Sequence, residues 1–151
     1  MVLMRWAVLS IVIVVTSHAG PCLSTIKPEA HAQPRHANPV ALKLTDPLSR
    51  RYRSALREAA LAPANFSGDH VLAQIGCGAG CIRIAAIDRQ SGRVSWFPAT
   101  ISGWPLAVTN PLQFDRNSPI LIVQGMLDER GPSTTRRYRF DGRRFQPLKR
   151  R

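Results

Sequence analysis

The fold of this chain is decided by residues 65–97, which read NFSGDHVLAQIGCGAGCIRIAAIDRQSGRVSWF. Two runs rich in apolar residues, 71–75 and 82–87, show the short-period alternation of strands that bury one face. The glycine-rich segment CGAGC joins them, so the pattern predicts an antiparallel hairpin. A second turn, DRQSG, ends on Gly92, and glycine's tolerance of positive φ suits a reversal into a third strand over residues 93–97.

Cys77 and Cys81 stand four positions apart with two glycines between them, and these let the backbone turn tightly enough for the sulfurs to meet. A structural disulfide is therefore favoured, with a stabilisation of about 2 kcal/mol for so short a loop. The pair could instead be redox-active, although its spacing is not that of thioredoxin-like sites. It could also bind a metal with Asp69 and His70, but no second cysteine pair strengthens that pattern.

Few residues suit catalysis. His70 could form an acid–base pair with Asp69 or Asp88 if the fold brings the two side chains together. Trp96 and Trp104 could form an aromatic platform for a sugar or a peptide, but in a small domain large aromatic residues more often belong to the core. We therefore assign no catalytic residue, no metal site and no cofactor.

The first 32 residues have the pattern of an export signal. Arg5 supplies a positive charge, residues 7–16 (AVLSIVIVVT) are apolar but too short to span a bilayer, and Ala30 and Ala32 are the small residues that the signal peptidase reads. We therefore expect residues 1–32 to be a signal peptide cleaved after Ala32, with cleavage after Ala19 as an alternative. The chain would then be periplasmic or secreted, with no transmembrane segment, and residues 33–45 would form an extended arm.

Asp46-Pro47 predicts the start of a helix, because Asp is a good N-cap and Pro is tolerated at the first helical position. Apolar residues then recur at spacings of three and four up to about residue 61, while Arg50, Arg53 and Arg57 share another face. The interval predicts one amphipathic helix, whose basic face is either solvated or in contact with a polyanion.

A second hairpin is predicted near the C-terminus, where Asp141-Gly142 separates residues 135–140 from residues 143–148. A two-residue turn would place Tyr138 opposite Phe145 on the core side and leave arginines on the other face. The candidate anion-binding residues on that face are Arg137, Arg139 and Arg144.

Residues 46–151 are thus expected to form a single β-rich domain of the α+β class. Its antiparallel sheet would be a meander of five to six strands, the most buried of them in the continuous apolar run at 120–123. One N-terminal amphipathic helix would pack on the sheet, and one short-loop disulfide would staple it.

The chain is strongly basic, with 21 Lys and Arg against 9 Asp and Glu and a net charge of +12. An exported protein seldom meets nucleic acid, so nucleic acid is disfavoured as a partner, and an anionic envelope polymer or lipid fits the charge better. The skew of 18 arginines to 3 lysines is also what codon bias in a GC-rich genome produces without any ligand.

The central motif resembles that of a group of small, uncharacterised exported proteins of Gram-negative bacteria. The shared residues form an N-F-x-G segment from Asn65 to Gly68, a G-C-G-x-x-C turn from Gly76 to Cys81 and a D-x-x-x-G turn from Asp88 to Gly92. Asp141, Gly142 and Phe145 match a later D-G-x-x-F hairpin. The resemblance implies a periplasmic location, a β-rich fold and a disulfide, and it implies no activity. In that pattern histidine and an aromatic residue follow the glycine, where this chain has Asp69 and His70.

These patterns favour an exported, non-enzymatic binding or envelope-associated protein that contacts anionic envelope components through an Arg-rich face. One alternative is a thiol–disulfide redox protein that works through Cys77 and Cys81. Another is an inhibitor of a secreted enzyme, whose partner would be an exported protein.

Overall fold

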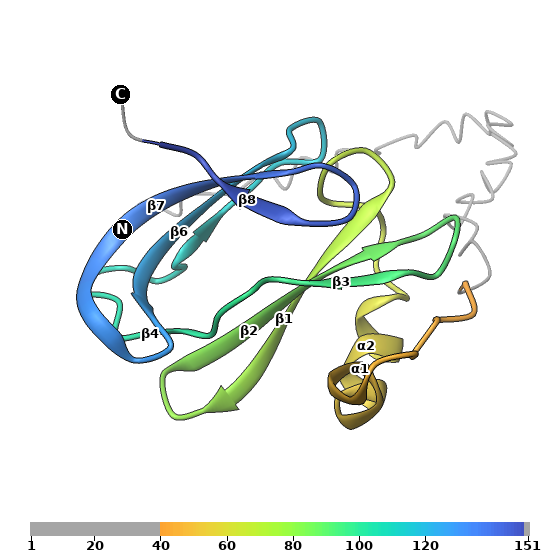
Figure 1. The fold of residues 1–151 in the computed structure, drawn as a ribbon, viewed down its shortest axis with the longest axis horizontal. Coiled ribbons are helices and arrows are strands. Elements are labelled where there is room, and N and C mark those ends of the chain that lie inside the picture. Colours follow the sequence, from red (N-terminus) through yellow and green to blue (C-terminus); the bar gives the residue numbers. More distant parts are fainter. Residues whose placement is uncertain (1–39, 150–151) are drawn as a thin grey trace, which may run out of the picture. The chain divides into compact units, whose positions relative to one another are not determined.

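The computed structural model describes residues 40–149. These residues form two helices, α1 (Pro47–Arg51) and α2 (Arg53–Ala59), and eight strands (Figure 1). The strands are β1 (His70–Gly78), β2 (Cys81–Asp88), β3 (Val94–Trp96), β4 (Ile101–Ser102), β5 (Leu112–Gln113), β6 (Ile120–Leu127), β7 (Arg130–Phe140) and β8 (Phe145–Pro147). The predicted signal peptide and residues 33–39 of the predicted arm lie outside the described residues. No helix within residues 40–149 is long and apolar enough to cross a membrane.

Two short helices replace the single helix that the sequence predicts. The first begins at the expected cap, where the Asp46 carboxylate accepts a hydrogen bond from the Ser49 backbone N–H at 2.8 Å. Tyr52 then leaves the helical region, with φ −99° and ψ 22°, and its ring lies 5.8 Å from that of Trp96 on β3. The Trp96 indole N–H donates to the Ser49 hydroxyl at 3.0 Å. The break therefore falls where the helical segment packs on β3.

The strands form one antiparallel sheet in the order β1-β2-β4-β6-β7-β8, with β3 paired to β2 and β5 paired to β6 beside this path. The sheet is thus antiparallel as predicted, but it has more strands than the expected five to six. The additional ones are β4 and β5, of two residues each, which lie in a proline-containing stretch with no periodic pattern.

Two long hairpins, β1–β2 and β6–β7, make up most of the sheet (Figure 1). Between them lies β4, where Ile101 pairs with Ile82 of β2 and with Leu127 of β6. Ser102 pairs in the same way with Cys81 and Met126. This two-residue strand is the backbone connection between the two hairpins.

The buried residues form two clusters on the two faces of the β1–β2 hairpin. The central core lies toward β6, β7 and β8, and Ile84, Leu121 and Phe140 are among its members. The helix-side core lies toward the helices, where Leu56 of α2 packs with Val71, Ile87 and others. Ile84 and Ile87 are both 0% exposed, so β2 is buried on both faces. The face of β6–β7 turned away from the central core, called the outer face below, carries the half-buried Ile120 and Ile122.

The C-terminal hairpin has a different register from the predicted one. Phe140 pairs with Phe145, and Tyr138 pairs with Pro147 rather than with Phe145. The reason is a longer loop over residues 141–144, in which the Asp141 carboxylate accepts hydrogen bonds from two backbone N–H groups, those of Arg143 and Arg144, at 2.8 and 2.7 Å. Because the shift is by two residues, the aromatic side chains still face the core.

Candidate anion-binding surface

Cys77 and Cys81 form the predicted disulfide, with an S–S distance of 2.00 Å and Cα atoms 5.2 Å apart. The bridge closes the end of the β1–β2 hairpin, where Gly78 pairs with Cys81 after a register irregularity. Gly78 and Gly80 have φ values of +145° and +62°, which side-chain-bearing residues rarely adopt. Both cysteines are half-buried in strand ends, and the bridge holds the turn in shape.

His70 and Asp88 come together as the sequence allowed, because they are paired residues of β1 and β2. His70 is nevertheless occupied by the fold: its Nδ1 lies 3.0 Å from the Ser67 carbonyl oxygen, and its ring meets the edge of Phe140 with centroids 5.0 Å apart. The arrangement fixes the start of β1 rather than exposing a base to a substrate.

The Asp88 carboxylate serves the DRQSG turn. It accepts hydrogen bonds from the backbone N–H groups of Gln90 and Ser91, at 2.8 and 3.1 Å, and from the Ser91 hydroxyl. Burial raises the pKa of Asp88, but these hydrogen bonds outweigh it and the net pKa is lowered. Asp69 accepts a hydrogen bond from the Gln90 side chain at 2.6 Å. Within residues 40–149, His, Cys, Asp and Glu side chains form no group of three that could hold a metal ion.

Both tryptophans pack against the cores. Trp96 packs against the helix-side core and Trp104 against the central core, each as a partly buried residue. Their rings therefore contribute to packing and do not form a shared platform.

The three candidate arginines are all exposed, but they do not form one cluster. Arg137 and Arg139 lie two positions apart on the outer face of β7, opposite Ile122 and Ile120 of β6. Arg144 lies in the loop that leads into β8, near Asp141, whose pKa is lowered chiefly by hydrogen bonds from the backbone N–H groups of Arg144 and Arg143 and to a smaller extent by the Arg144 charge. Arg137 and Arg139 thus keep the predicted shared face, and Arg144 stands at its end.

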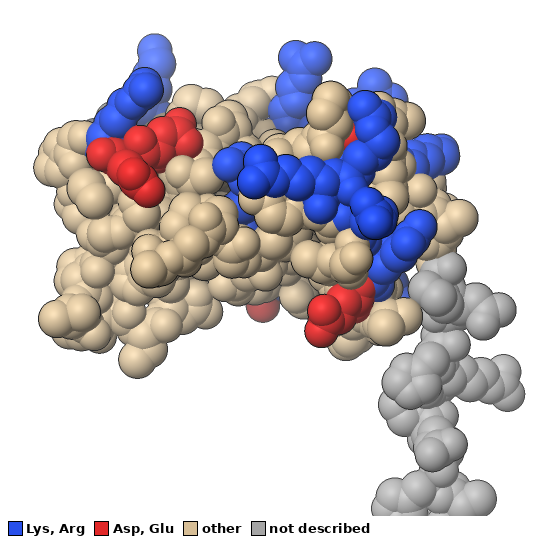
Figure 2. Space-filling model, turned by 90° about the horizontal axis from the view of Figure 1, so that it is seen from below, with Lys and Arg blue, Asp and Glu red and all other residues tan. Residues whose placement is uncertain are grey.

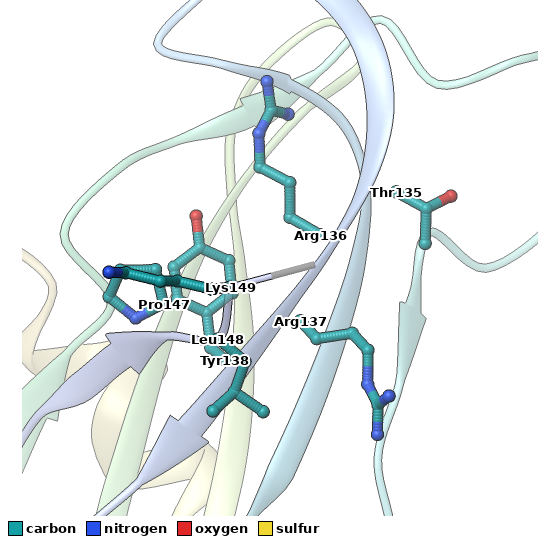
Figure 3. Close-up of a pocket in the computed structure, with 7 residues that line it drawn as sticks. All are labelled: Thr135, Arg136, Arg137, Tyr138, Pro147, Leu148 and Lys149. Atoms are coloured by element: carbon teal, nitrogen blue, oxygen red, sulfur yellow. The ribbon is translucent and has the colours of Figure 1, made fainter. Parts of the chain in front are cut away.

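A cavity of about 640 Å³ lies beside Arg137, where β8 ends. It is lined by β7 residues 135–138 and by Pro147, Leu148 and Lys149 (Figure 3). The Leu148 backbone N–H donates to the Arg137 carbonyl at 2.8 Å, which keeps the C-terminal segment alongside β7. Arg136 and Arg137 extend in opposite directions from the strand, as side chains of successive strand residues do (Figure 3).

Arg136 is the residue of this cavity that the sequence reading missed. Its guanidinium donates to the Gly125 carbonyl on β6 at 3.1 Å. Burial raises the pKa of the neighbouring Tyr138 phenol, and the charge of Arg136 offsets part of that effect. The sequence did contain a signal for this role, because Arg136 is a charged residue at a strand position that shares its face of β7 with the core residue Tyr138. Such a residue indicates that β7 extends beyond the central core.

A second, shallower cavity of about 370 Å³ adjoins Arg137 on the outer face. Ile120, Ile122 and Phe114 form its apolar lining, and Asp115 adds one carboxylate. Arg137 lines both cavities, so it adjoins the apolar residues Ile120 and Ile122 as well as the cavity that Lys149 lines.

Basic side chains also gather away from β7. On the face drawn in Figure 2, Lys and Arg side chains are densest in the right half of the view, the half that carries α1 and α2 in Figure 1, whereas Asp and Glu occur in small separate groups. The exposed arginines of the helices are Arg50, Arg51, Arg53 and Arg57.

No protein-family model matches the sequence, and the searches of curated proteins and of solved structures found nothing significantly similar to it.

Proposed function

We propose that this chain is an exported, non-enzymatic module that binds an anionic component of the bacterial envelope through the outer face of β7 and the adjoining C-terminal segment. The observation that carries the proposal is the position of Arg137, which lines two cavities and lies in the same region as Lys149. The net charge of +12 and the export-signal pattern of residues 1–32 support it. Its envelope location follows the resemblance to small exported proteins of Gram-negative bacteria.

Apolar contact would complement charge at this site. Along β7, Arg137 and Arg139 alternate with inward-facing residues. The half-buried Ile120 and Ile122 of β6 lie between these arginines and β5. A guanidinium binds phosphate or carboxylate with two parallel hydrogen bonds, and neighbouring apolar surface accepts the less polar part of the same molecule. Lipopolysaccharide, which carries phosphate groups next to acyl chains, is the probe of choice.

The test is binding of purified lipopolysaccharide by the full protein over a series of salt concentrations. We expect Arg137→Gln/Arg139→Gln to weaken binding by about fivefold to tenfold, because two exposed charge contacts contribute up to about 1 kcal/mol each. Arg50→Gln/Arg51→Gln removes the same charge from α1, which lines none of these cavities, and serves as the matched control. Affinity that is unchanged between low and high salt, or lost equally in both double variants, would contradict the proposed site.

Export is tested separately by the intact mass of the protein recovered from the periplasm. We expect a mature chain that starts at Gln33 and resists thiol alkylation at Cys77 and Cys81. A mass that retains residues 1–32 would overturn the proposed export. Alkylation of both cysteines would overturn the oxidised state of the pair. A redox role would then return, although both cysteines lie in a strand hairpin and not at the helix start that lowers a cysteine pKa in thioredoxin-like sites.

A further inference from the structure

An apolar groove of about 470 Å³ lies between the segment 40–44 and the end of α2, apart from the outer face of β7. Its volume is within the range of about 300–1,000 Å³ that is typical of small-molecule sites. The apolar residues that line it are Val40, Ala41, Leu42, Leu44, Ala60 and Leu61.

The groove is built into the fold. Ala60 is 4% exposed and belongs to the helix-side core, and Leu42 and Leu44 pack against that core. Leu61, at the end of the groove beyond α2, is 62% exposed. The groove therefore offers apolar surface from a buried floor to an open side.

The wall formed by residues 40–44 is held by the DRQSG turn. The Lys43 backbone N–H donates to the Gly92 carbonyl at 2.8 Å, and the backbones of Lys43 and Arg93 form an isolated parallel β-bridge. Gly92 has φ +71°, and a Cβ at this position would lie 2.1 Å from the Ala41 carbonyl oxygen. Glycine is thus required for this close approach, and the wall is positioned without any ligand.

Charge at the groove is supplied by α2. Arg57 and Glu58 line it, and Arg53 lies one helical turn before Arg57 on the same helix face. Two of the helix arginines have partners inside the domain: Arg50 donates to the Thr45 carbonyl at 2.6 Å and Arg51 lies 5.7 Å from the centroid of the Tyr52 ring.

Arg53 and Arg57 are different, because within residues 40–149 their guanidinium groups have no such contact. Like charges four positions apart on a helix repel each other. An anionic group bound between them would relieve that repulsion.

We propose that this groove binds a single-chain anionic amphiphile, with the hydrocarbon chain along the apolar lining and the carboxylate head at Arg57 and Arg53. The apolar lining would accept the hydrocarbon chain, and Arg57 and Arg53, which have no partner within residues 40–149, would accept the negative head. A neutral or a cationic amphiphile could contact the apolar lining but would not pair with the arginines. Glu58 opposes the head group, so its removal should strengthen binding.

The experiment is isothermal titration calorimetry of the full protein with dodecanoate below its micelle concentration. We expect saturable binding of one dodecanoate per chain, and binding of acetate and of dodecyltrimethylammonium that is at least tenfold weaker. Arg57→Gln and Leu61→Gln should each weaken dodecanoate binding severalfold, while Glu58→Gln should strengthen it. Circular dichroism spectra checked against the parent protein ensure that each variant is folded.

Arg130→Gln removes one positive charge from the exposed start of β7, which does not line the groove, and should leave dodecanoate binding unchanged. Failure of this proposal remains distinguishable from failure of the lipopolysaccharide site, because each ligand is measured against variants of its own site. Equal binding of dodecanoate and dodecyltrimethylammonium would overturn the proposal. So would an unchanged affinity in both Arg57→Gln and Glu58→Gln. Sedimentation of the ligand-free protein adds a third test: a dimer that Leu61→Gln dissociates would mean that a second copy of the chain fills the groove.

Discussion

The β1–β2 and β6–β7 hairpins are similar in length but closed in different ways. The first ends in a disulfide and in glycines with positive φ, whereas the second turns through Asp128 and Glu129, non-glycine residues with φ +50° and +60°. The Asp128 carboxylate accepts hydrogen bonds from the backbone N–H and the hydroxyl of Thr100, at 2.8 and 3.1 Å. One turn is stabilised within the hairpin and the other by a residue distant in the sequence.

The two hairpins also differ in burial. β2 is enclosed by the central core on one face and by the helix-side core on the other, while the outer face of β6 is partly open. Enclosure on both faces explains why apolar residues of β2 point to both sides of the sheet, whereas on β7 the outward positions can hold the exposed Arg137 and Arg139.

The largest expected effect tests this difference in burial. Ile87→Ala removes a side chain that is 0% exposed in the helix-side core, and we expect the free energy of unfolding to fall by about 2–5 kcal/mol. Ile122→Ala, the same substitution on the half-buried outer face of β6, should cost about 1 kcal/mol or less. Urea unfolding measures both, and equal losses would mean that β2 is not enclosed on its helix side.

The next effect concerns the disulfide. Replacing both cysteines, as Cys77→Ala/Cys81→Ala, should lower the free energy of unfolding by about 2 kcal/mol, because the bridge restricts a short loop of the unfolded chain. The parent protein in reductant should lose a similar amount, and the double variant should not respond to reductant. A reductant effect that persists in the double variant would show that the bridge is not its cause.

Substitutions to glycine in the two turns should have opposite signs. Glu129→Gly should raise the free energy of unfolding by about 0.5–1 kcal/mol, since it relieves a side chain held at φ +60°. Ala79→Gly, at the tip of the disulfide hairpin, should lower it by about 0.5–1 kcal/mol, because position 79 is not among the residues with positive φ and glycine adds freedom to the unfolded chain. Thermal unfolding of the two variants gives the comparison, and a shared sign would argue against strain at Glu129.

The smallest effect is a pH dependence in the turns that follow the hairpins. Hydrogen bonds from the backbone N–H groups of Arg144 and Arg143 hold the pKa of Asp141 below its ordinary value of 3.8. The pKa of Asp88 is also lowered, because the hydrogen bonds from Ser91 and Gln90 outweigh the opposite effect of burial.

As the pH falls below about 4, the unfolded chain binds protons before these carboxylates do, so stability is full above that pH and declines as the pH falls through the folded pKa values. Unfolding measured between pH 2 and pH 6 should give a flatter profile for Asp88→Asn and for Asp141→Asn than for the parent protein. A profile as steep in both variants as in the parent would assign the acid sensitivity to other groups.

The features that could be predicted from the sequence are those set by neighbouring residues. The β1–β2 hairpin and its disulfide follow from alternation and from a four-residue cysteine spacing, and the outward position of Arg137 and Arg139 follows from the pleat. The break at Tyr52 could not be predicted, since it coincides with a ring contact to Trp96 of β3, which is distant in the sequence.

The same reason accounts for the other differences. β7 begins at Arg130, before the predicted residue 135, and the turn that precedes it is held by hydrogen bonds between Thr100 and Asp128, which are distant in the sequence. The two-residue strand β4 is defined by its pairing with β2 and β6, which no local pattern indicates. The role of Arg136 depends on a carbonyl of the neighbouring strand. Contacts between distant segments, and not local propensity, decide each of these features.

The small size of β4 bears on how the domain opens. In the part of the chain that the structure describes, only Ile101 and Ser102 pair with strands of both hairpins, so the cohesion of the sheet depends mainly on side chains that both hairpins contribute to the central core. Native-state hydrogen exchange would report this as a single cooperative unit when that core is intact. Thinning the core, for example with Ile101→Ala, should let the amides of one hairpin exchange while those of the other stay protected.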